Sequence, residues 1–307
     1  SRRSLQALGL SLALIAACVY FGFRVDNFWK PDNLLDLLRQ SAINTILSVG
    51  MTFVILTAGI DLSVGSTLCL CAIVVANLLD YGSSAVLAAV VGLIAGALCG
   101  LLNGTCVVAG RLSPFIVTLG TLWGLRGIAR WLCNDRTVMI KDSAFMAVSR
   151  AEPLGIPMPA VLALACVVAA QVILTRTTFG RSVFAVGGSE EAAWVSGVRV
   201  GWTKASVYVI SGLTAGIAAI VSAAKLGSGS PTVGVAYELD AIAATVLGGT
   251  SLMGGEGSVV GTLIGAVFIQ SLRKGMSMIP VVDYKQNIAI GGAIVVGALV
   301  DRFMRSR

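Results

Sequence analysis

The sequence contains no histidine and little charge. None of its 307 residues is histidine, and only 12% are Asp, Glu, Lys or Arg. The missing histidine excludes hydrolases that use a histidine base and metal centres with imidazole ligands. Soluble domains usually carry about 25% charged residues, so half that share argues against a soluble enzyme or a solvated binding module.

Two further kinds of site are missing. No segment matches GxxxxGK[ST], the loop whose backbone amides hold nucleotide phosphates, so we expect no P-loop ATP site in this chain. The seven cysteines lie almost all within apolar runs and follow no metal-ligand spacing. We therefore expect no metal site and no catalytic residue, and we expect the cysteines to act as small apolar side chains.

Long apolar runs fill most of the chain. Hydrophobic residues make up 56% of it, and a helix needs about 20 apolar residues to cross a bilayer. The runs predict an all-α fold, a polytopic transmembrane helical bundle with about ten segments, and we treat residues 1–307 as one domain. The expected segments are 5–23, 34–57, 62–79, 84–109, 114–133, 158–175, 203–224, 238–253, 258–279 and 287–303. Glycine pairs interrupt 238–253, which favours a short or discontinuous helix there.

Basic residues set the expected orientation. Membrane proteins concentrate Lys and Arg in cytoplasmic loops, and the net charge of +7 fits that excess better than nucleic-acid binding. With the N-terminus inside, an even number of spans places both termini and residues 176–204 in the cytoplasm. The loop 134–157 is then expected on the outer side.

Glycines repeat on single faces of two expected spans. Gly92, Gly96 and Gly100 are four residues apart, as are Gly212 and Gly216. Such faces let helix backbones approach closely in lipid. We expect them to pack against each other within one chain rather than to form a dimer motif.

No acidic residue stands alone at the centre of an expected span. Asp36, Asp61, Glu238 and Asp240 fall near span ends, whereas proton- and sodium-coupled transporters place carboxylates within the membrane. This favours a transporter that receives its energy from another subunit. Two other classes stay open: a gradient-driven secondary transporter, which needs an intramembrane ion site, and an intramembrane enzyme, which needs a nucleophile with a base or metal ligands.

The most polar segment is 176–204. Within it Ser189 is placed as the N-cap of a short helix, Glu190 and Glu191 favour its first turn, and Gly197 suits the position after its end. A helix of about seven residues is unstable alone in water. We therefore expect it to dock on another surface; an ordinary capped loop helix is the alternative.

Several motifs along the chain occur in a recognisable order. They are GMTFVILTA at 50–58, GIDLSVGS at 59–66, NG at 103–104, PFIVTLG at 114–120 with RG at 126–127, TFGR at 178–181 with GG at 187–188, and YELDAIAA at 237–244 running into LGGTSLMGGEGSVVGTLIGA at 247–266. Each motif alone is weak. In this order, over nearly the whole chain, the set resembles the membrane subunits of bacterial sugar ABC importers of the ribose type.

The resemblance implies a permease of the bacterial inner membrane that moves a monosaccharide, a ribose-like pentose or related sugar, into the cytoplasm. It implies a homodimer embedded in membrane lipid, with ATP-binding subunits at the cytoplasmic face, a periplasmic sugar-binding protein outside and no nucleic acid. ATP and Mg²⁺ would be bound by the partner subunit. This chain would then be a transport subunit without a cofactor of its own, and not an enzyme.

The resemblance also gives the short helix a role, because such importers dock a cytoplasmic helix on the ATPase. The residues so assigned are Gly188, Ser189, Glu190, Glu191, Ala192, Ala193, Trp194 and Gly197. The small alanines are expected to allow close docking, and the glutamates to face basic groups of the partner. Ser189 stands where Asn is frequent and Trp194 where a basic residue is common, which leaves the partner surface and the sugar open.

Polar residues within the expected spans are candidates for the translocation path. We select Ser41, Asn44, Thr45, Asn103 and Thr118, with Gln171 and Gln270 as further candidates. Hydrogen bonding between helices is the alternative role for such residues in a membrane.

Overall fold

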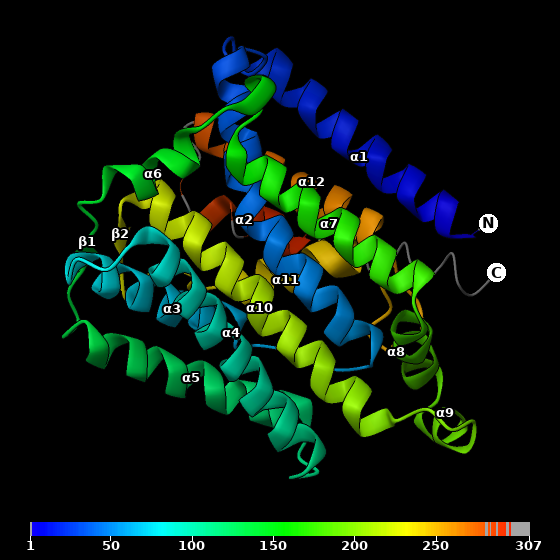
Figure 1. The fold of residues 1–307 in the computed structure, drawn as a ribbon. Coiled ribbons are helices and arrows are strands. Elements are labelled where there is room, and N and C mark those ends of the chain that lie inside the picture. The colour runs from blue at the N-terminus through cyan, green and yellow to red at the C-terminus, as the bar shows by residue number, and fades with distance from the viewer. Residues whose placement is uncertain (1, 280–281, 283, 287, 293–294, 296–307) are drawn as a thin grey trace.

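The computed structural model is a bundle of helices with a short two-stranded ribbon at one end (Figure 1). It describes residues 2–279, 282, 284–286, 288–292 and 295. The elements in order are α1 (Arg2–Arg24), α2 (Pro31–Leu56), α3 (Val64–Asp80), α4 (Ala85–Val108), α5 (Pro114–Leu132), β1 (Val138–Met139), α6 (Ser143–Arg150), a 3-10 turn (Pro153–Gly155), α7 (Met158–Arg176), α8 (Thr178–Gly188), α9 (Glu190–Val195), α10 (Val200–Leu226), β2 (Ser228–Gly229), α11 (Tyr237–Leu247) and α12 (Val259–Met278). The predicted all-α class is confirmed.

The helices follow the apolar runs closely. Eight of the expected segments, all but 238–253 and 287–303, coincide with a helix to within three residues at each end. Among the described residues, α4, α7 and α10 are long and apolar enough to cross a membrane. The last expected segment, 287–303, falls largely outside the described residues, so the number of spans stays a prediction.

The expected segment 238–253 is wrong in its end point. Its helix, α11, stops at Leu247 after 11 residues, a length of about 16 Å against a hydrocarbon core of about 30 Å. The chain turns there because the Gly248 backbone lies directly on Gly261, where an added Cβ would be 2.4 Å from a carbonyl carbon. Gly249 then takes a φ of +89°. The interrupted helix that the glycine pairs favoured is therefore present.

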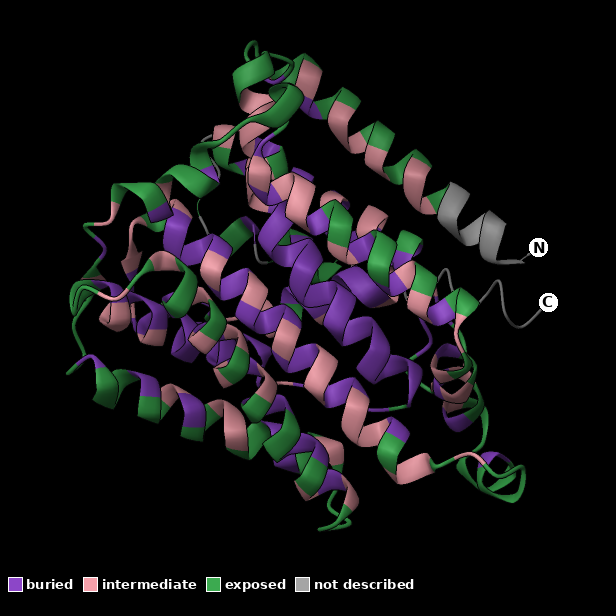
Figure 2. Cartoon of the chain, viewed as in Figure 1, coloured by how far each residue is buried: buried purple, intermediate pink, exposed green. Residues whose placement is uncertain are grey.

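Two helices form the centre of the bundle. Every residue of α2 from Ser41 to Leu56 is buried, and α10 is buried along most of its length (Figure 2). Glycines bring α10 against α4: a Cβ on Gly96 would lie 2.3 Å from the Gly212 carbonyl oxygen, and one on Gly100 would lie 2.1 Å from that of Tyr208. The expected packing within one chain is confirmed.

The two ends of the bundle differ. One carries α8 and α9; the other carries the ribbon, α6 and the connection from α1 to α2 (Figure 1). In the ribbon, Val138 pairs with Gly229 and Met139 with Ser228 in antiparallel register. Since α10 follows α9 and leads directly into β2, it runs the whole way from one end to the other.

The connection between α2 and α3 folds back into the bundle. Asp61 is only 2% exposed. Its carboxylate accepts hydrogen bonds from the Ser63 amide (2.9 Å) and hydroxyl (2.6 Å), and from the Ser211 hydroxyl (2.8 Å). Ser211 is in the fourth turn of α10, about 16 Å along the helix from Val200. Asp61 does lie between the ends of α2 and α3, as expected, but its carboxylate is buried within the bundle, because a turn in sequence need not be at the surface of the fold.

Candidate functional site

The short helix α9 starts as its sequence predicts. It spans Glu190–Val195, and the Ser189 hydroxyl accepts a hydrogen bond from the Ala192 amide at 3.2 Å. Glu190 and Glu191 occupy its first turn, where a carboxylate stabilises the free amides and the positive end of the helix dipole. The predicted N-cap is confirmed.

The end of α9 is also as predicted. The backbone of Gly197 has a φ of +82°, its amide donates to the Trp194 carbonyl at 2.9 Å, and the Val198 amide donates to the Ala193 carbonyl at 3.0 Å. These two bonds define a Schellman motif, whose left-handed residue is most often glycine. Capped at both ends, α9 keeps its helical form despite its six residues.

Only part of α9 faces outward. Trp194 and Val195 are 71% and 74% exposed, and Glu191 and Ala192 are exposed beside them. Ala193 is 3% exposed and faces its own chain, whereas Ala192 is exposed; that the small alanines allow close docking stays a prediction.

The two glutamates have different surroundings. Glu190 forms an ion pair with Lys204 at the start of α10, which ties α9 to its own chain. No described residue forms an ion pair with Glu191. Both glutamates are exposed, but Glu191 is the carboxylate of α9 that has no ion pair with a described residue to compete with a basic partner group.

Glycines seat α8 on the rest of the bundle. A Cβ on Gly187, in the last turn of α8, would lie 1.8 Å from the Leu56 carbonyl oxygen and 2.4 Å from the Gly255 amide. That amide donates to the same carbonyl at 2.9 Å. Gly188, the residue selected from the sequence, has nothing within 4 Å of such a Cβ. The backbone of Gly188 does lie close to Gly255, where an added Cβ would be 2.9 Å from the Gly188 Cα. The position that leaves no room for a side chain is the neighbouring Gly187, and the only sequence signal for it was the glycine pair.

The start of α10 makes the second attachment. Trp202 meets Phe179 of α8 edge to face, with ring centroids 5.6 Å apart, and Lys204 holds Glu190 of α9. The α8–α9 pair thus contacts the end of α2, the loop 248–258 and the start of α10. A displacement of the pair is passed to all three through direct contacts.

The residues predicted for the path separate into two groups. The Asn103 amide donates to the Ser63 hydroxyl at 2.8 Å, and the Thr118 hydroxyl donates to the Ile60 carbonyl at 3.1 Å. Both side chains are 0% exposed and hold the connection before α3. These are hydrogen bonds between packed segments; a role in the path stays a prediction for both residues.

The other group lies on α2. Ser41, Asn44 and Thr45 are 3%, 4% and 1% exposed. Within the described residues, the Ser41 hydroxyl and the Asn44 amide nitrogen have no hydrogen-bond partner. Asn44 lines a cavity together with Gln270, while Thr45 and Gln171 do not.

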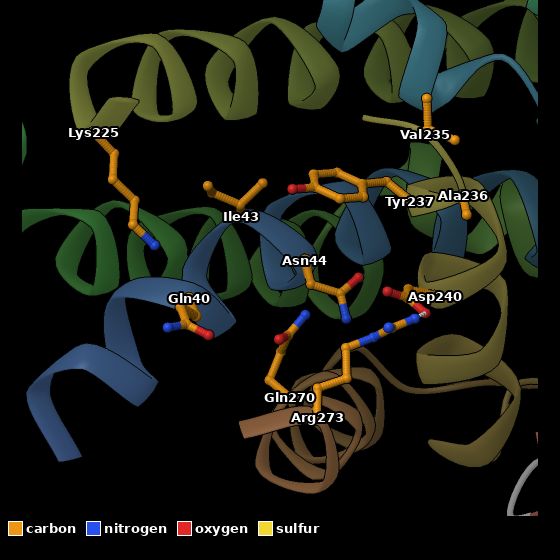
Figure 3. Close-up of a pocket in the computed structure, with 10 residues that line it drawn as sticks. All are labelled: Gln40, Ile43, Asn44, Lys225, Val235, Ala236, Tyr237, Asp240, Gln270 and Arg273. Atoms are coloured by element: carbon orange, nitrogen blue, oxygen red, sulfur yellow. Dashed lines mark hydrogen bonds and ion pairs between the residues drawn. The ribbon is translucent and has the colours of Figure 1, made fainter. Parts of the chain in front are cut away.

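The cavity lies between α2, the end of α10, the start of α11 and α12 (Figure 3). Its volume is about 460 Å³, within the range of small-molecule sites. The lining residues are Gln40, Ile43, Asn44, Lys225, Val235, Ala236, Tyr237, Asp240, Gln270 and Arg273. Arg273 donates to the Asp240 carboxylate at 2.7 Å. Sequence reasoning did not select Lys225, Tyr237 or this ion pair, because nothing local in the chain brings α10, α11 and α12 together.

The chain is similar to known permeases over nearly its whole length. The sequence profile of the family described as branched-chain amino acid transport system / permease component matches residues 33–300. The ribose import permease protein RbsC of Bacillus subtilis is 42% identical over 300 residues, covering 97% of this chain and 93% of the relative. The RbsC protein of Escherichia coli K12 is 40% identical over 304 residues, covering 98% and 93%. The D-allose transport system permease protein AlsC of Escherichia coli K12 is 36% identical over 295 residues, covering 95% and 90%.

No solved structure matches the chain. The family match covers residues 33–300, including α9 and the cavity, and the relatives cover 95–98% of the chain. The chain therefore belongs to the family of ABC importer permeases that includes the ribose import permeases, and it is a multi-pass transport subunit of the bacterial inner membrane.

Proposed function

We propose that this chain moves a monosaccharide, a ribose-like pentose or related sugar, into the cytoplasm, driven by ATP hydrolysis on a partner subunit. The observation that carries the proposal is 40–42% identity to ribose import permeases over more than nine-tenths of the chain. The D-allose permease at 36% and the xylose permease XylH at 33% identity support monosaccharides as the substrate class.

The ATP-hydrolysing subunit docks on α9 in this proposal. The helix is short, capped at both ends and presents Trp194 and Val195 to solvent. Exposed aromatic residues are frequent anchors of protein interfaces. The contacts of α8 and α9 with α2, α10 and the loop 248–258 then carry the partner's movement into the bundle.

The complete importer comprises two copies of this chain, ATP-binding subunits and a periplasmic sugar-binding protein. The partner subunit alone binds ATP and Mg²⁺, and the lack of any P-loop sequence in this chain supports that division. Both termini and residues 176–204 face the cytoplasm, which the basic residues of these segments support.

Reconstitution of the importer tests this function. The permease is purified with its cognate ATPase, placed in proteoliposomes and supplied with the binding protein and ribose, xylose, allose or glucose. We expect the sugar-loaded binding protein to stimulate ATP hydrolysis and at least one monosaccharide to be taken up.

An ionophore serves as the decisive control, because the buried carboxylate of Asp61 is of a kind that ion-coupled transporters use. ATP-driven uptake should continue when the proton and sodium gradients are collapsed. Uptake that stops under these conditions while ATP remains would refute the proposal in favour of a secondary transporter.

A further inference from the structure

The cavity contains polar groups whose hydrogen bonds the protein does not complete. Within the described residues, the Asn44 amide nitrogen and the Arg273 Nε are buried without a partner. The ammonium group of Lys225 forms no ion pair with a described residue. Buried donors without partners are costly to a fold, so these two groups, with the half-buried Lys225 ammonium on the same cavity, indicate a ligand that supplies acceptors.

The lining also supplies acceptors and an apolar surface. The Asp240 carboxylate is held by Arg273, and the amide groups of Gln270 and Asn44 point toward each other in the middle of the site (Figure 3). The ring of Tyr237 lies alongside Ile43 at one edge (Figure 3). Donors, acceptors and one aromatic face together match a sugar ring, whose hydroxyls both donate and accept and whose C–H face is apolar.

The charged residues that line the cavity limit the chemical class of ligand that it can bind. Lys225 and Arg273 are basic, whereas Asp240 is the one acidic residue of the lining. A metal cation would meet more positive than negative charge here. A neutral polyol avoids this repulsion and still uses the charged groups, since hydrogen bonds to charged partners are the stronger kind.

The cavity shares its walls with the elements that seat α8 and α9. Asn44 is on α2, whose last residue, Leu56, contacts Gly187. Lys225 is at the far end of α10, whose start holds α9 through Lys204. A displacement of the α8–α9 pair therefore alters the distances between groups that line the cavity.

We propose that this cavity is a transient binding station for the monosaccharide inside the permease. Asn44, Lys225, Asp240 and Arg273 bond its hydroxyl groups, and Tyr237 covers its apolar face. The identity of the cargo rests on the proposed function. Binding is weak, because a station that must pass its cargo onward cannot hold it tightly.

Two substitutions test the station in the reconstituted importer. Lys225→Met and Asn44→Leu each remove one donor and keep a side chain of similar length. Their matched controls are Lys141→Met, which changes a side chain 85% exposed outside the cavity, and Asn77→Leu, which does not line it. Ribose uptake and binding-protein-stimulated ATP hydrolysis are measured for all four.

We expect each cavity variant to lower ribose uptake about tenfold, the effect of a lost hydrogen bond to a polar or charged group. ATP hydrolysis should stay within about twofold of wild type, because α9 and its seat are unchanged. If Lys225 and Asn44 had only a structural role, their substitution would lower ribose uptake and ATP hydrolysis together. Wild-type uptake in both cavity variants would overturn the proposal.

A second measurement does not depend on these variants. Gln40→Cys, in an importer whose native cysteines are replaced, places a thiol in the wall of the cavity. Millimolar ribose should slow its alkylation, while equimolar betaine should not. Equal rates of alkylation in ribose and in betaine would overturn the proposed binding station. This result would hold even if the Lys225→Met variant does not accumulate in the membrane.

The two proposals fail in different ways. Wild-type importer that takes up no monosaccharide contradicts the proposed function. Wild-type importer that takes up ribose, with no protection of the Gln40→Cys thiol, contradicts the station alone.

Discussion

The contact of Gly187 with the end of α2 offers the sharpest test of how α8 and α9 are held. Replacing Gly187 by Ala adds one methyl group that would lie 1.8 Å from the Leu56 carbonyl oxygen. Ordinary van der Waals contact begins at 3.4 Å, so α8 must withdraw by about 1.6 Å, the difference between the two distances. The same methyl group would be 2.4 Å from the Gly255 amide.

The energetic cost follows from these contacts. Overpacking a tight contact costs about 1–3 kcal/mol. If Gly255, which is half-buried, also loses its hydrogen bond to Leu56, an amide without a partner costs about 1–3 kcal/mol more. The higher helix propensity of Ala relative to Gly offsets about 1 kcal/mol of this cost. When both contacts are disturbed, the net cost of about 1–5 kcal/mol shifts the equilibrium from seated toward displaced α8 by at least about fivefold, since 1.4 kcal/mol is a factor of ten.

The neighbouring glycine is a matched control. Gly188→Ala makes the same chemical change in the same helix, where an added Cβ has nothing within 4 Å. Hydrogen exchange of peptides covering 178–188 and 190–195, measured by mass spectrometry, reports the seating of both helices. We expect Gly187→Ala to speed this exchange at least about fivefold, with Gly188→Ala close to wild type.

Function is measured on the same two variants. In the reconstituted importer, Gly187→Ala should lower sugar uptake, while its amount in the membrane should be normal because the spans are unchanged. Equal hydrogen exchange and equal uptake in Gly187→Ala and Gly188→Ala would refute the reasoning. The contact of Gly187 with Leu56 and Gly255 would then accommodate the methyl group without an energetic cost.

Three further predictions concern topology, docking and the buried carboxylate. Single cysteines at Ser189 and Ser143, in a chain without its native cysteines, should label from opposite sides of the membrane; labelling of both from outside contradicts the topology. Trp194→Ala should lower recovery of the ATPase in pull-downs about tenfold at an unchanged permease level, because a large exposed aromatic is a typical interface anchor; full recovery would place the contact elsewhere. Asp61→Ala should lower the Tm more than Asp61→Asn, because Asn still accepts hydrogen bonds from Ser63 whereas Ala leaves buried hydroxyls unpaired at about 1–3 kcal/mol each; equal Tm values would show that Asp61 is not needed as an acceptor.

Features encoded by neighbouring residues were predictable. Apolar runs predicted the helices because the length of a span is set by the membrane and every backbone group must be bonded within it. The caps of α9 were predictable because Ser189 and Gly197 act on amides and carbonyls only a few residues away. The glycine faces of α4 and α10 were predictable because helical periodicity places such residues in one row.

Features that depend on distant segments were not predictable in this way. Asp61 looked like a residue at a span end, and its buried position depends on Ser211, 150 residues later. Gly187 and Gly188 are equivalent in sequence, and only the position of Leu56 distinguishes them. The cavity combines residues of α2, α10, α11 and α12, each of which by itself has an ordinary polar residue within an apolar helix.

The length of α10 has a geometric consequence. Lys204, which holds α9, and Lys225, which lines the cavity, are 21 residues apart on one continuous helix, a distance of about 31 Å at 1.5 Å per residue. If the helix pivots near its first turns, a tilt of about five degrees carries Lys225 sideways by about 3 Å, roughly the length of a hydrogen bond. A rotation too small to disturb the packing beside α9 is thus large enough to make or break a contact in the cavity.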